Sequence, residues 1–267
     1  MIIWIVSYPK SGNTWVRLFL KKYFELTNQS VNAGIFPDID HLKRLNIDYK
    51  KFINITKNWD LLQTELNLKH KTNYLKTHNA LCTIGNSKFT NKEQTIGGIY
   101  LIRDPRDVVI SYAHHLNKTH GETLEMMINP YTVENPKIDG EEIVKTLMGR
   151  WSDHLNSWKS YKDRKILFIK YENLVDDTYN EFLKILNYLS EIDNIKINYE
   201  KIKESIEETS FKKLSEDEKK FGFKEATGHG SFFRKGVVGD WKKNLDSKIV
   251  KKLEETFFKE MKELGYL

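Results

Sequence analysis

Cysteine is nearly absent from this sequence of 267 residues, which contains only Cys82. A disulfide within the chain is therefore excluded, Cys82 cannot anchor a cysteine-rich metal site, and a reducing, cytoplasmic location is expected. No apolar run reaches the roughly 18 residues of a membrane-spanning helix. Met1–Val6 is apolar but lacks the basic n-region and the small-residue cleavage site of a secretory signal. The sequence thus excludes a membrane-anchored or disulfide-stabilised protein.

A strong excess of charge of one sign is also missing. The formal net charge is +6 at pH 7, and with 30% charged and 39% hydrophobic residues the chain has the composition of a globular protein. The mild basic surplus favours an anionic ligand, but its residues are too scattered to indicate a nucleic-acid surface by themselves. No cluster of His, Cys, Asp and Glu has the spacing of a metal site, so no metal is expected.

The chain does contain short apolar runs that alternate with longer helical patterns. Runs rich in β-branched residues predict strands at Ile2–Ser7, Asn73–Lys76, Ile99–Ile102 and Ile166–Tyr171. Apolar spacing predicts helices at about Thr14–Leu26, Pro105–Leu116 and Thr178–Leu189. This alternation predicts an α/β fold with a central parallel sheet covered by helices on both faces.

Two further apolar stripes recur every three or four residues and predict helices with core-facing sides. One stripe consists of Ile143, Leu147, Trp151, Leu155 and Trp158, and the other of Val250, Leu253, Phe257, Met261 and Leu264. Ser247 is the expected N-cap of the second helix and Gly265 its stop. The segments Ser30–Lys71 and Asn117–Glu141 lack strong periodicity, which fits either insertions around a substrate pocket or plain surface loops.

The first chemically informative block is Tyr8-Pro9-Lys10-Ser11-Gly12-Asn13-Thr14, which lies between the first predicted strand and helix. Amides at the start of a helix have no internal partner, and the helix dipole favours an anion there. Gly12 lets the backbone approach phosphate oxygens, and the side chains around it add donors. The block therefore predicts a phosphate-binding turn, in which Lys10 supplies a point charge.

This turn differs from the Walker A loop of ATP- and GTP-binding proteins, G-x-x-x-x-G-K-[ST]. Lys10 precedes Gly12 here, and the first glycine of that pattern is missing. A standard ATP or GTP site is therefore not expected.

The second block is Gly98–His115, in which Arg103 closes a predicted strand. Asp104 is a suitable N-cap, and Pro105 suits the first position of a helix. Ser111 lies about two turns into that helix and could face the same crevice as Arg103 at the carboxyl end of the sheet. A surface salt bridge for Arg103 and a solvated position for Ser111 are the alternatives.

The third block is Phe232–Lys242, in which Arg234 and Lys235 precede Gly236. These adjacent cations predict a second anion site, although a basic surface loop anchored by Trp241 is the alternative. Glycine is otherwise sparse, yet Gly222, Gly228, Gly230, Gly236 and Gly239 fall close together. A glycine-rich loop late in an α/β chain is a candidate lid or ligand clamp.

With all three blocks in one chain, the sequence resembles the sulfotransferases that use 3′-phosphoadenosine 5′-phosphosulfate (PAPS), and in particular the soluble, small-molecule branch with its bacterial members. Y-P-K-S-G-N-T-W is similar to the family's 5′-phosphosulfate loop, and Arg103–Ser111 is similar to its 3′-phosphate site. R-K-G-V-V-G-D-W-K resembles the family's C-terminal signature. The resemblance implies a P-loop-like sulfotransferase fold and one domain spanning residues 1–267.

The resemblance also assigns individual residues. It implies that His78, in L-K-T-H, is the catalytic base, and that Lys10 and Ser111 complete the catalytic set. Tyr171 and the T-S-F-K segment from Thr209 match the family's adenine site. The implied PAPS-binding residues are Lys10, Ser11, Gly12, Asn13, Thr14, Trp15, Arg103, Ser111, Tyr171, Thr209, Phe211, Arg234, Lys235 and Gly236. Trp15 and Phe211 would sandwich the purine, whereas core packing is the alternative for each aromatic residue.

The implied reaction is an in-line transfer of SO₃ from PAPS to a hydroxyl or amine of a small-molecule or carbohydrate acceptor. His78 takes the acceptor proton, Lys10 stabilises the leaving 5′-phosphate, and Ser111 holds the 3′-phosphate and restrains Lys10 until the acceptor binds. By analogy with phosphoryl transfer, positioning and charge stabilisation supply most of the catalysis, and no metal is needed.

Three alternatives stay open at the level of sequence. A P-loop phosphotransferase would turn over ATP with Mg²⁺, and the position of Lys10 argues against it. A non-enzymatic nucleic-acid-binding protein would show a steep salt dependence of binding. A relative that binds nucleotide without catalysis is disfavoured because Lys10, His78 and Ser111 are all present.

The acceptor and the assembly are the least determined features. The family's K-x-x-x-T-V-x-x-x-E dimer motif is missing after Trp241, so a monomer or a different dimer is expected. Acceptor-pocket walls are expected from Ser30–Lys71, His114–Glu141 and Gly222–Ser231. Phe36, Trp59 and Tyr131 are candidates for an apolar lining that would suit a phenol or a steroid-like alcohol, whereas the polar neighbours suit a sugar equally well.

Overall fold

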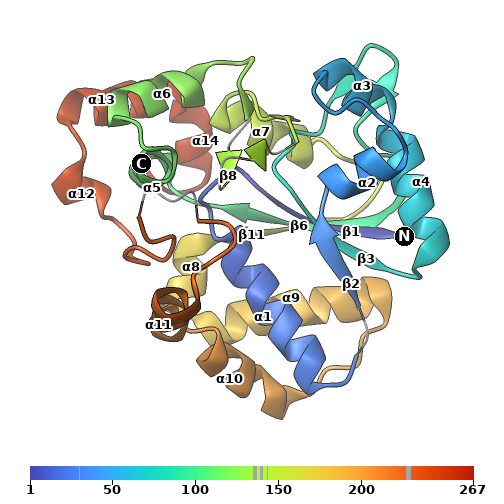
Figure 1. Ribbon diagram of the computed structural model, residues 1–267. Helices are drawn as coiled ribbons and strands as arrows, with labels where there is room; N and C mark the ends of the chain where they lie inside the picture. Colours follow the sequence, from blue (N-terminus) through green and yellow to red (C-terminus); the bar gives the residue numbers. More distant parts are fainter. Residues whose placement is uncertain (30, 135–136, 139–140, 143, 227–229) are drawn as a thin grey trace.

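The computed structural model describes residues 1–29, 31–134, 137–138, 141–142, 144–226 and 230–267. Its centre is a sheet of five parallel strands in the order β11-β6-β1-β3-β2 (Figure 1). The strands are β1 (Ile2–Ser7), β2 (Asn32–Ile35), β3 (Asn73–Thr77), β6 (Thr95–Ile102) and β11 (Ile166–Lys170). The predicted α/β fold with a central parallel sheet is confirmed.

Alternation along β1 explains why helices cover both faces of the sheet. Successive side chains of a strand point to opposite faces. Ile2, Trp4 and Val6 enter one apolar cluster, whereas Ile3 and Ile5 enter the other. All six residues of β1 are buried, as expected for a strand in the middle of a parallel sheet.

One face is covered mainly by helices that follow β1 and β11 (Figure 1). They are α1 (Asn13–Leu26), α8 (Tyr171–Asp176), α9 (Thr178–Asp193) and α10 (Tyr199–Glu208). The opposite face is covered by α2 (Ile39–Arg44), α3 (Phe52–Lys57), α4 (Trp59–Lys69), α5 (Pro105–Leu116), α6 (His120–Ile128), α7 (Trp151–Lys159), α13 (Ser247–Thr256) and α14 (Phe258–Glu263). The helices after the neighbouring strands β1 and β6 thus lie on opposite faces, which creates a crevice between the two carboxyl ends.

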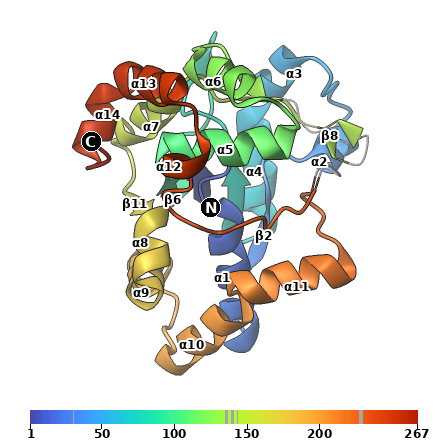
Figure 2. The ribbon, with the colours of Figure 1, turned by 90° about the vertical axis from the view of Figure 1, so that its left-hand side faces the viewer.

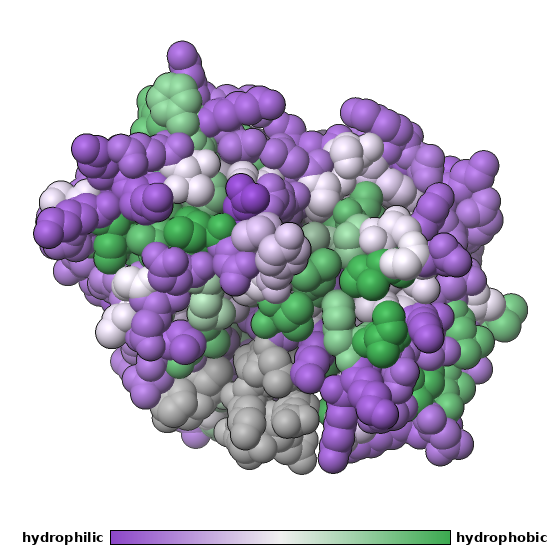
Figure 3. All heavy atoms as spheres, turned by 90° about the horizontal axis from the view of Figure 1, so that it is seen from above, coloured by the Kyte–Doolittle hydropathy of each residue, from purple (hydrophilic) through white to green (hydrophobic). Residues whose placement is uncertain are grey.

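The remaining elements lie around this frame. They are α11 (Phe211–Phe221), α12 (Trp241–Asn244) and the paired short strands β4 (Thr83–Ile84) with β5 (Ser87–Lys88), β7 (Val133–Glu134) with β10 (Thr146–Leu147), and β8 (Lys137–Ile138) with β9 (Glu141–Glu142). Residues 230–240, which lead into α12, pass across the molecule in Figure 2. Seen from above, polar side chains surround smaller apolar groups on the surface (Figure 3).

Three local predictions are wrong in detail. The stripe from Ile143 to Trp158 is not one helix, because Leu147 lies in β10 and α7 begins at Trp151, while Ile143 lies outside the described residues. The last predicted helix is divided at Phe257 into α13 and α14. Its N-cap is Asp246, whose carboxylate accepts from Lys248 N, and not Ser247. The edge strand β2 was not predicted.

Candidate functional site

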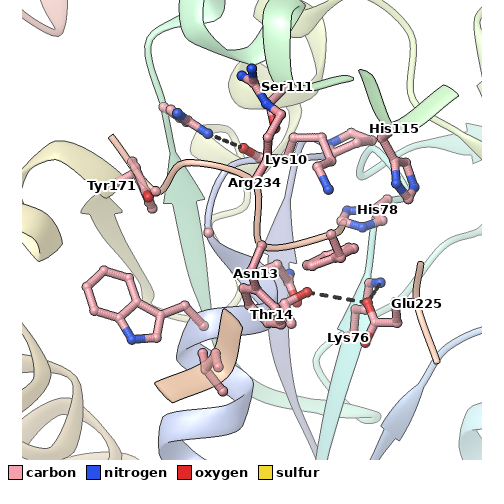
Figure 4. A pocket seen from close by; sticks show the side chains of 18 of the residues that line it. Lys10, Asn13, Thr14, Lys76, His78, Ser111, His115, Tyr171, Glu225 and Arg234 are labelled. Atoms are coloured by element: carbon pink, nitrogen blue, oxygen red, sulfur yellow. Dashed lines mark hydrogen bonds and ion pairs between the residues drawn. The ribbon is translucent and has the colours of Figure 1, made fainter. Parts of the chain in front are cut away.

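A cavity of about 440 Å³ lies at the carboxyl edge of the sheet. Residues at or just after the ends of all five strands line it: Pro9 and Lys10 after β1, Phe36 after β2, His78 after β3, Arg103 after β6 and Tyr171 after β11. The close-up shows Lys10, His78 and Tyr171 around this cavity (Figure 4). Parallel strands all end at one edge, so this convergence follows from the topology. Thirteen of the sequence-predicted site residues line this cavity: Lys10, Gly12, Asn13, Thr14, Trp15, His78, Arg103, Ser111, Tyr171, Phe211, Arg234, Lys235 and Gly236.

The turn from β1 to α1 has the shape of an anion site. Lys10 and Gly12 both adopt positive φ, +64° and +98°, and a Cβ on Gly12 would lie 2.8 Å from the Tyr171 ring. Gly12 is the N-cap of α1, so no side chain caps the first amides of that helix. The Ser11 hydroxyl is fully buried and has no hydrogen-bond partner in the described part of the chain. Uncapped amides beside an unsatisfied hydroxyl suit an anionic ligand.

Lys10 carries a weakened charge in this turn. Its Nζ lies 3.8 Å from the centroid of the Phe232 ring. Burial, together with the neighbouring Lys76, lowers the pKa of Lys10 to about 7. Within the described residues, no carboxylate lies within 4 Å of Nζ, and no hydrogen bond joins Lys10 to Ser111. An anion bound here would favour the protonated ammonium.

Arg103 connects two cationic turns. The first is the turn at Lys10 between β1 and α1, and the second is the turn that carries Arg234, Lys235 and Val237. One guanidinium nitrogen donates to Lys10 O at 3.1 Å and the other terminal nitrogen donates to Val237 O at 3.0 Å. The guanidinium also lies 4.4 Å from the centroid of the Tyr171 ring. Its buried Nε has no hydrogen-bond partner in the described residues. The predicted cap is confirmed as well, since Asp104 accepts from Arg106 N and Pro105 opens α5.

The second cationic turn is fixed on α5. Asp107 of α5 accepts from Gly239 N at 2.7 Å and from Trp241 N at 3.0 Å. Arg234 and Lys235 both form ion pairs with Asp240, at 3.3 and 2.8 Å. These two cations therefore line the cavity already paired with a carboxylate, and they are not free point charges.

Phe211 lies directly over the second turn. Gly236 has a φ of +64°, and a Cβ at this position would overlap the Phe211 ring. Trp15 lines the same cavity and packs edge-on against Tyr171, with ring centroids 6.2 Å apart. The Trp15 indole N–H is buried without a partner in the described residues. The aromatic rings predicted from sequence thus all line the cavity.

Two predicted site residues do not line the cavity. Ser11 belongs to the turn itself and is fully buried. Thr209 is buried at the end of α10, where its hydroxyl donates to Ser205 O at 2.6 Å and so serves the helix terminus. Two that do line it have side chains already engaged: Asn13 donates to Ile5 O at 3.0 Å, and Thr14 donates to Glu225 at 3.3 Å.

His78 has a defined orientation. Its Nδ1 lies 2.7 Å from Ser7 O, and because a carbonyl only accepts, Nδ1 carries the proton and Nε2 carries the lone pair. Burial and the neighbouring Lys76 hold the pKa of His78 well below the ordinary imidazole value. The imidazole is therefore neutral at neutral pH, which is the state a proton acceptor needs.

Sequence reasoning missed two carboxylates in this cavity. Glu225 accepts from Lys76 Nζ at 2.9 Å and also pairs with Arg17. Figure 4 shows Glu225 beside Lys76 and Thr14. Burial would raise the pKa of Glu225, but Lys76 and Arg17 outweigh it and hold that pKa well below the ordinary value. Glu134 is buried and accepts from the Tyr112 hydroxyl at 2.8 Å. The only sequence signal for Glu225 was its position in the glycine-rich segment. That signal pointed to the segment as a ligand clamp but did not single out Glu225.

The expected acceptor walls are partly correct. Phe36, His115 and Glu225 come from the three predicted segments and line the cavity. The prediction is wrong for two aromatic residues: Trp59 is fully buried in the core against Phe89, and Tyr131 is 82% exposed. Ser30, residues 135–136 and 139–140, and Gly228 lie outside the described residues.

Two features are missing from the described part of the chain. No helix in this part of the chain is long and apolar enough to cross a membrane. No group of three or more His, Cys, Asp or Glu residues in the described ranges is arranged to hold a metal ion.

Known proteins with similar sequences include several sulfotransferases. Sulfotransferase 1E1 of Rattus norvegicus is 29% identical over 276 residues, covering 97% of this chain and 83% of the relative. The amine sulfotransferase of Oryctolagus cuniculus is 26% identical over 275 residues, covering 98% and 81%. A solved mouse sulfotransferase complexed with PAP has a TM-score of 0.65 at 23% identity, covering 97% of this chain and 84% of that one.

A solved retinol dehydratase in complex with androsterone and the inactive cofactor PAP has a similar fold, with a TM-score of 0.63 at 19% identity. It covers 98% of this chain and 80% of its own. The model of the sulfotransferase domain family matches residues 2–265. The chain therefore belongs to the sulfotransferase family and is a sulfotransferase enzyme.

Proposed function

We propose that this enzyme transfers a sulfonate group from PAPS to a hydroxyl or amine of a small-molecule or carbohydrate acceptor, in the cytoplasm and without a metal. The observation that carries the proposal is the convergence of the Lys10 turn, Arg103 and the neutral His78 on one cavity. The solved relatives with PAP support the donor, and the relatives with amine or steroid names support a small acceptor.

Three buried polar atoms of the proposed donor-site residues support PAPS as the ligand. They are Ser11 Oγ, Trp15 Nε1 and Arg103 Nε, and none has a partner in the described residues. A buried donor without a partner costs about 1–3 kcal/mol, which a ligand that accepts the hydrogen bond recovers. Phosphate oxygens and purine nitrogens are acceptors of this kind, so the residues present fit the donor.

The proposed donor contacts form three groups, one for each part of PAPS. Lys10, Ser11, Gly12, Asn13 and Thr14 would hold the 5′-phosphosulfate at the start of α1. Arg103, Ser111, Arg234, Lys235 and Gly236 would hold the 3′-phosphate. Trp15, Tyr171 and Phe211 would contact adenine, with Thr209 behind them. The hydroxyls of Thr14 and Thr209 already donate within the protein, so we assign them positioning contacts.

His78 is proposed as the general base. Its Nδ1–H is held by the Ser7 carbonyl, so its Nε2 lone pair takes the proton of the acceptor group. The acceptor oxygen or nitrogen then forms its bond to sulfur while the bond from sulfur to the 5′-phosphate oxygen breaks. The protonated Lys10 stabilises the charge that develops on that leaving oxygen.

Removal of the His78 imidazole tests this mechanism. We expect His78→Ala to bind adenosine 3′,5′-bisphosphate (PAP) with unchanged affinity and to lose about 10²- to 10⁴-fold in transfer rate. Binding is measured by calorimetry and transfer by mass spectrometry, which scores acceptor products heavier by one SO₃. The exposed His70 provides a matched control, since His70→Ala should change neither quantity.

Two results would contradict the proposal. Normal transfer by His78→Ala would eliminate the base assignment. Binding of ATP as tight as binding of PAP, or Mg²⁺-dependent ATP turnover, would replace the sulfotransferase donor by a P-loop mechanism. Phenols, steroid alcohols and sugars in the same mass-spectrometric screen identify the acceptor class.

A further inference from the structure

One face of α7 holds the backbone that carries His78. Three side chains of this helix reach the segment 78–81, which directly follows β3. Trp158 Nε1 donates to Asn79 O at 3.0 Å, Ser157 Oγ accepts from Leu81 N at 2.9 Å, and His154 Nε2 lies 3.1 Å from His78 O. Positions three and four residues apart lie on the same side of a helix, so these three side chains reach one segment. Of the three, only His154 contacts a main-chain atom of His78 itself, whereas Ser157 contacts Leu81.

The contact between His154 and His78 has a defined direction. A carbonyl oxygen only accepts, so Nε2 of His154 must carry the proton, and Nδ1 must be the acceptor. Nδ1 indeed lies 2.7 Å from the Tyr100 hydroxyl, which donates to it. His154 and Tyr100 are buried, and burial lowers the pKa of His154 to about 4. The neutral imidazole is thus held in a single tautomer by the hydroxyl of a β6 residue.

His78 is consequently held at both ends. Ser7 of β1 accepts from the imidazole Nδ1, and His154 of α7 donates to the main-chain carbonyl. His154 does not itself line the cavity. The bond at Nδ1 holds the ring and the bond at the carbonyl holds the His78 peptide, so both bonds bear on where Nε2 points.

We propose that His154 is a positioning residue that sets the orientation of the general base through the His78 carbonyl. The inference rests on the proposed role of His78. It predicts that His154 acts on the chemical step and not on donor binding, because the donor-site residues Lys10 and Arg103 make no contact with α7 in the described hydrogen bonds.

Three variants separate positioning from structure. His154→Leu removes both hydrogen bonds, and a displacement of the base of about 1 Å is expected to lower kcat about 100-fold. PAP affinity should stay unchanged. His154→Gln should recover most of the activity, because its amide can donate to His78 O and accept from Tyr100. Ser157→Ala, on the same helix face, is the matched control and should lower thermal stability without lowering kcat.

The pH dependence of kcat gives a readout that a purely structural role would not change. The groups that face His78 are Lys76, Glu225 and His154, with Lys10, His115 and Glu134 elsewhere on the cavity wall. The acid limb of the profile reports protonation of the base. Once His154→Leu releases the segment, the imidazole is less closely held beside Lys76, so this limb should move to higher pH. Ser157→Ala should leave the limb where it is.

The outcomes distinguish this inference from the proposed function. Wild-type kcat and an unchanged acid limb in folded His154→Leu would overturn the positioning role, as would a His154→Gln variant no better than His154→Leu. If His78→Ala, measured alongside, transfers sulfonate normally, the base assignment itself fails. If His154→Leu does not fold, Tyr100→Phe decides, since it removes only the bond that selects the tautomer: a lowered kcat with normal PAP affinity supports the role, and an unchanged kcat overturns it.

Discussion

Binding of PAP should draw a proton onto Lys10. Burial and Lys76 lower the pKa of this lysine to about 7 in the ligand-free protein. A phosphate placed in the turn between β1 and α1 favours the charged ammonium and returns the pKa towards its ordinary value of about 10.4. The bound state therefore holds more protons than the free state at every pH between these two values, and affinity must fall as the pH rises.

The magnitude follows from the two pKa values. At pH 8 a group with a pKa of about 7 is only about 10% protonated, so binding should take up about 0.9 proton per PAP. From pH 7 to pH 9 the free ammonium is depleted about 50-fold, which predicts a loss of affinity of about 50-fold, or about 2.3 kcal/mol. Below about pH 6 the proton uptake by Lys10 should nearly vanish.

Calorimetry in buffers with different ionisation enthalpies measures this uptake directly. Lys10→Arg is the matched control, because arginine stays charged throughout this range and should bind PAP without uptake at pH 8. The ligand's own phosphate titrates near pH 6, and it contributes equally in both proteins. Equal proton uptake by the wild type and Lys10→Arg at pH 8 would refute the reasoning.

Two further substitutions test contacts around the cavity. Glu225→Gln breaks a largely buried set of ion pairs with Lys76 and Arg17 and should lower the stability at pH 7 by about 3 kcal/mol, as measured by thermal unfolding. Because the folded pKa of Glu225 lies well below the unfolded value of about 4.3, the stabilisation begins to be lost below about pH 4 and is gone only below the folded pKa. The gap between the two proteins should therefore narrow steadily as the pH falls below about 4, and a gap that does not narrow would exclude the ionic origin. Gly236→Ala should displace the Phe211 ring and weaken PAP binding at least tenfold by calorimetry, whereas an unchanged affinity would mean that Phe211 does not contact the nucleotide.

Residues at the ends of buried strands were the most predictable part of the site. The strand at Ile2–Ser7 is an uninterrupted apolar run, and the turn after it could be located to the residue. The same holds for Arg103, because Asp104 and Pro105 mark the start of α5. In a parallel sheet these strand ends meet at one edge. Sequence alone could therefore place the turn after β1 and Arg103 at the end of β6 in one site.

Contacts between distant segments were not predictable in this way. Glu225 pairs with Lys76 across 149 positions, and nothing local to either residue reports the other. β2 was missed because Asn32-Ala33-Gly34-Ile35 is an exposed edge strand without an apolar run. Trp59 was assigned to the pocket because its segment lacks periodicity, yet it is buried against Phe89, since tertiary packing outweighed the local pattern.

The double attachment of Arg103 has a consequence for how the enzyme would discriminate between donors. Its guanidinium ties the backbone of the first turn at Lys10 to that of the second at Val237, so neither turn can shift alone. A ligand that contacts only one of the two turns gains no binding energy from the other. A nucleotide sulfate without its 3′-phosphate would then be penalised in turnover as well as in occupancy, because binding energy at the remote end is spent on alignment at the reacting sulfur.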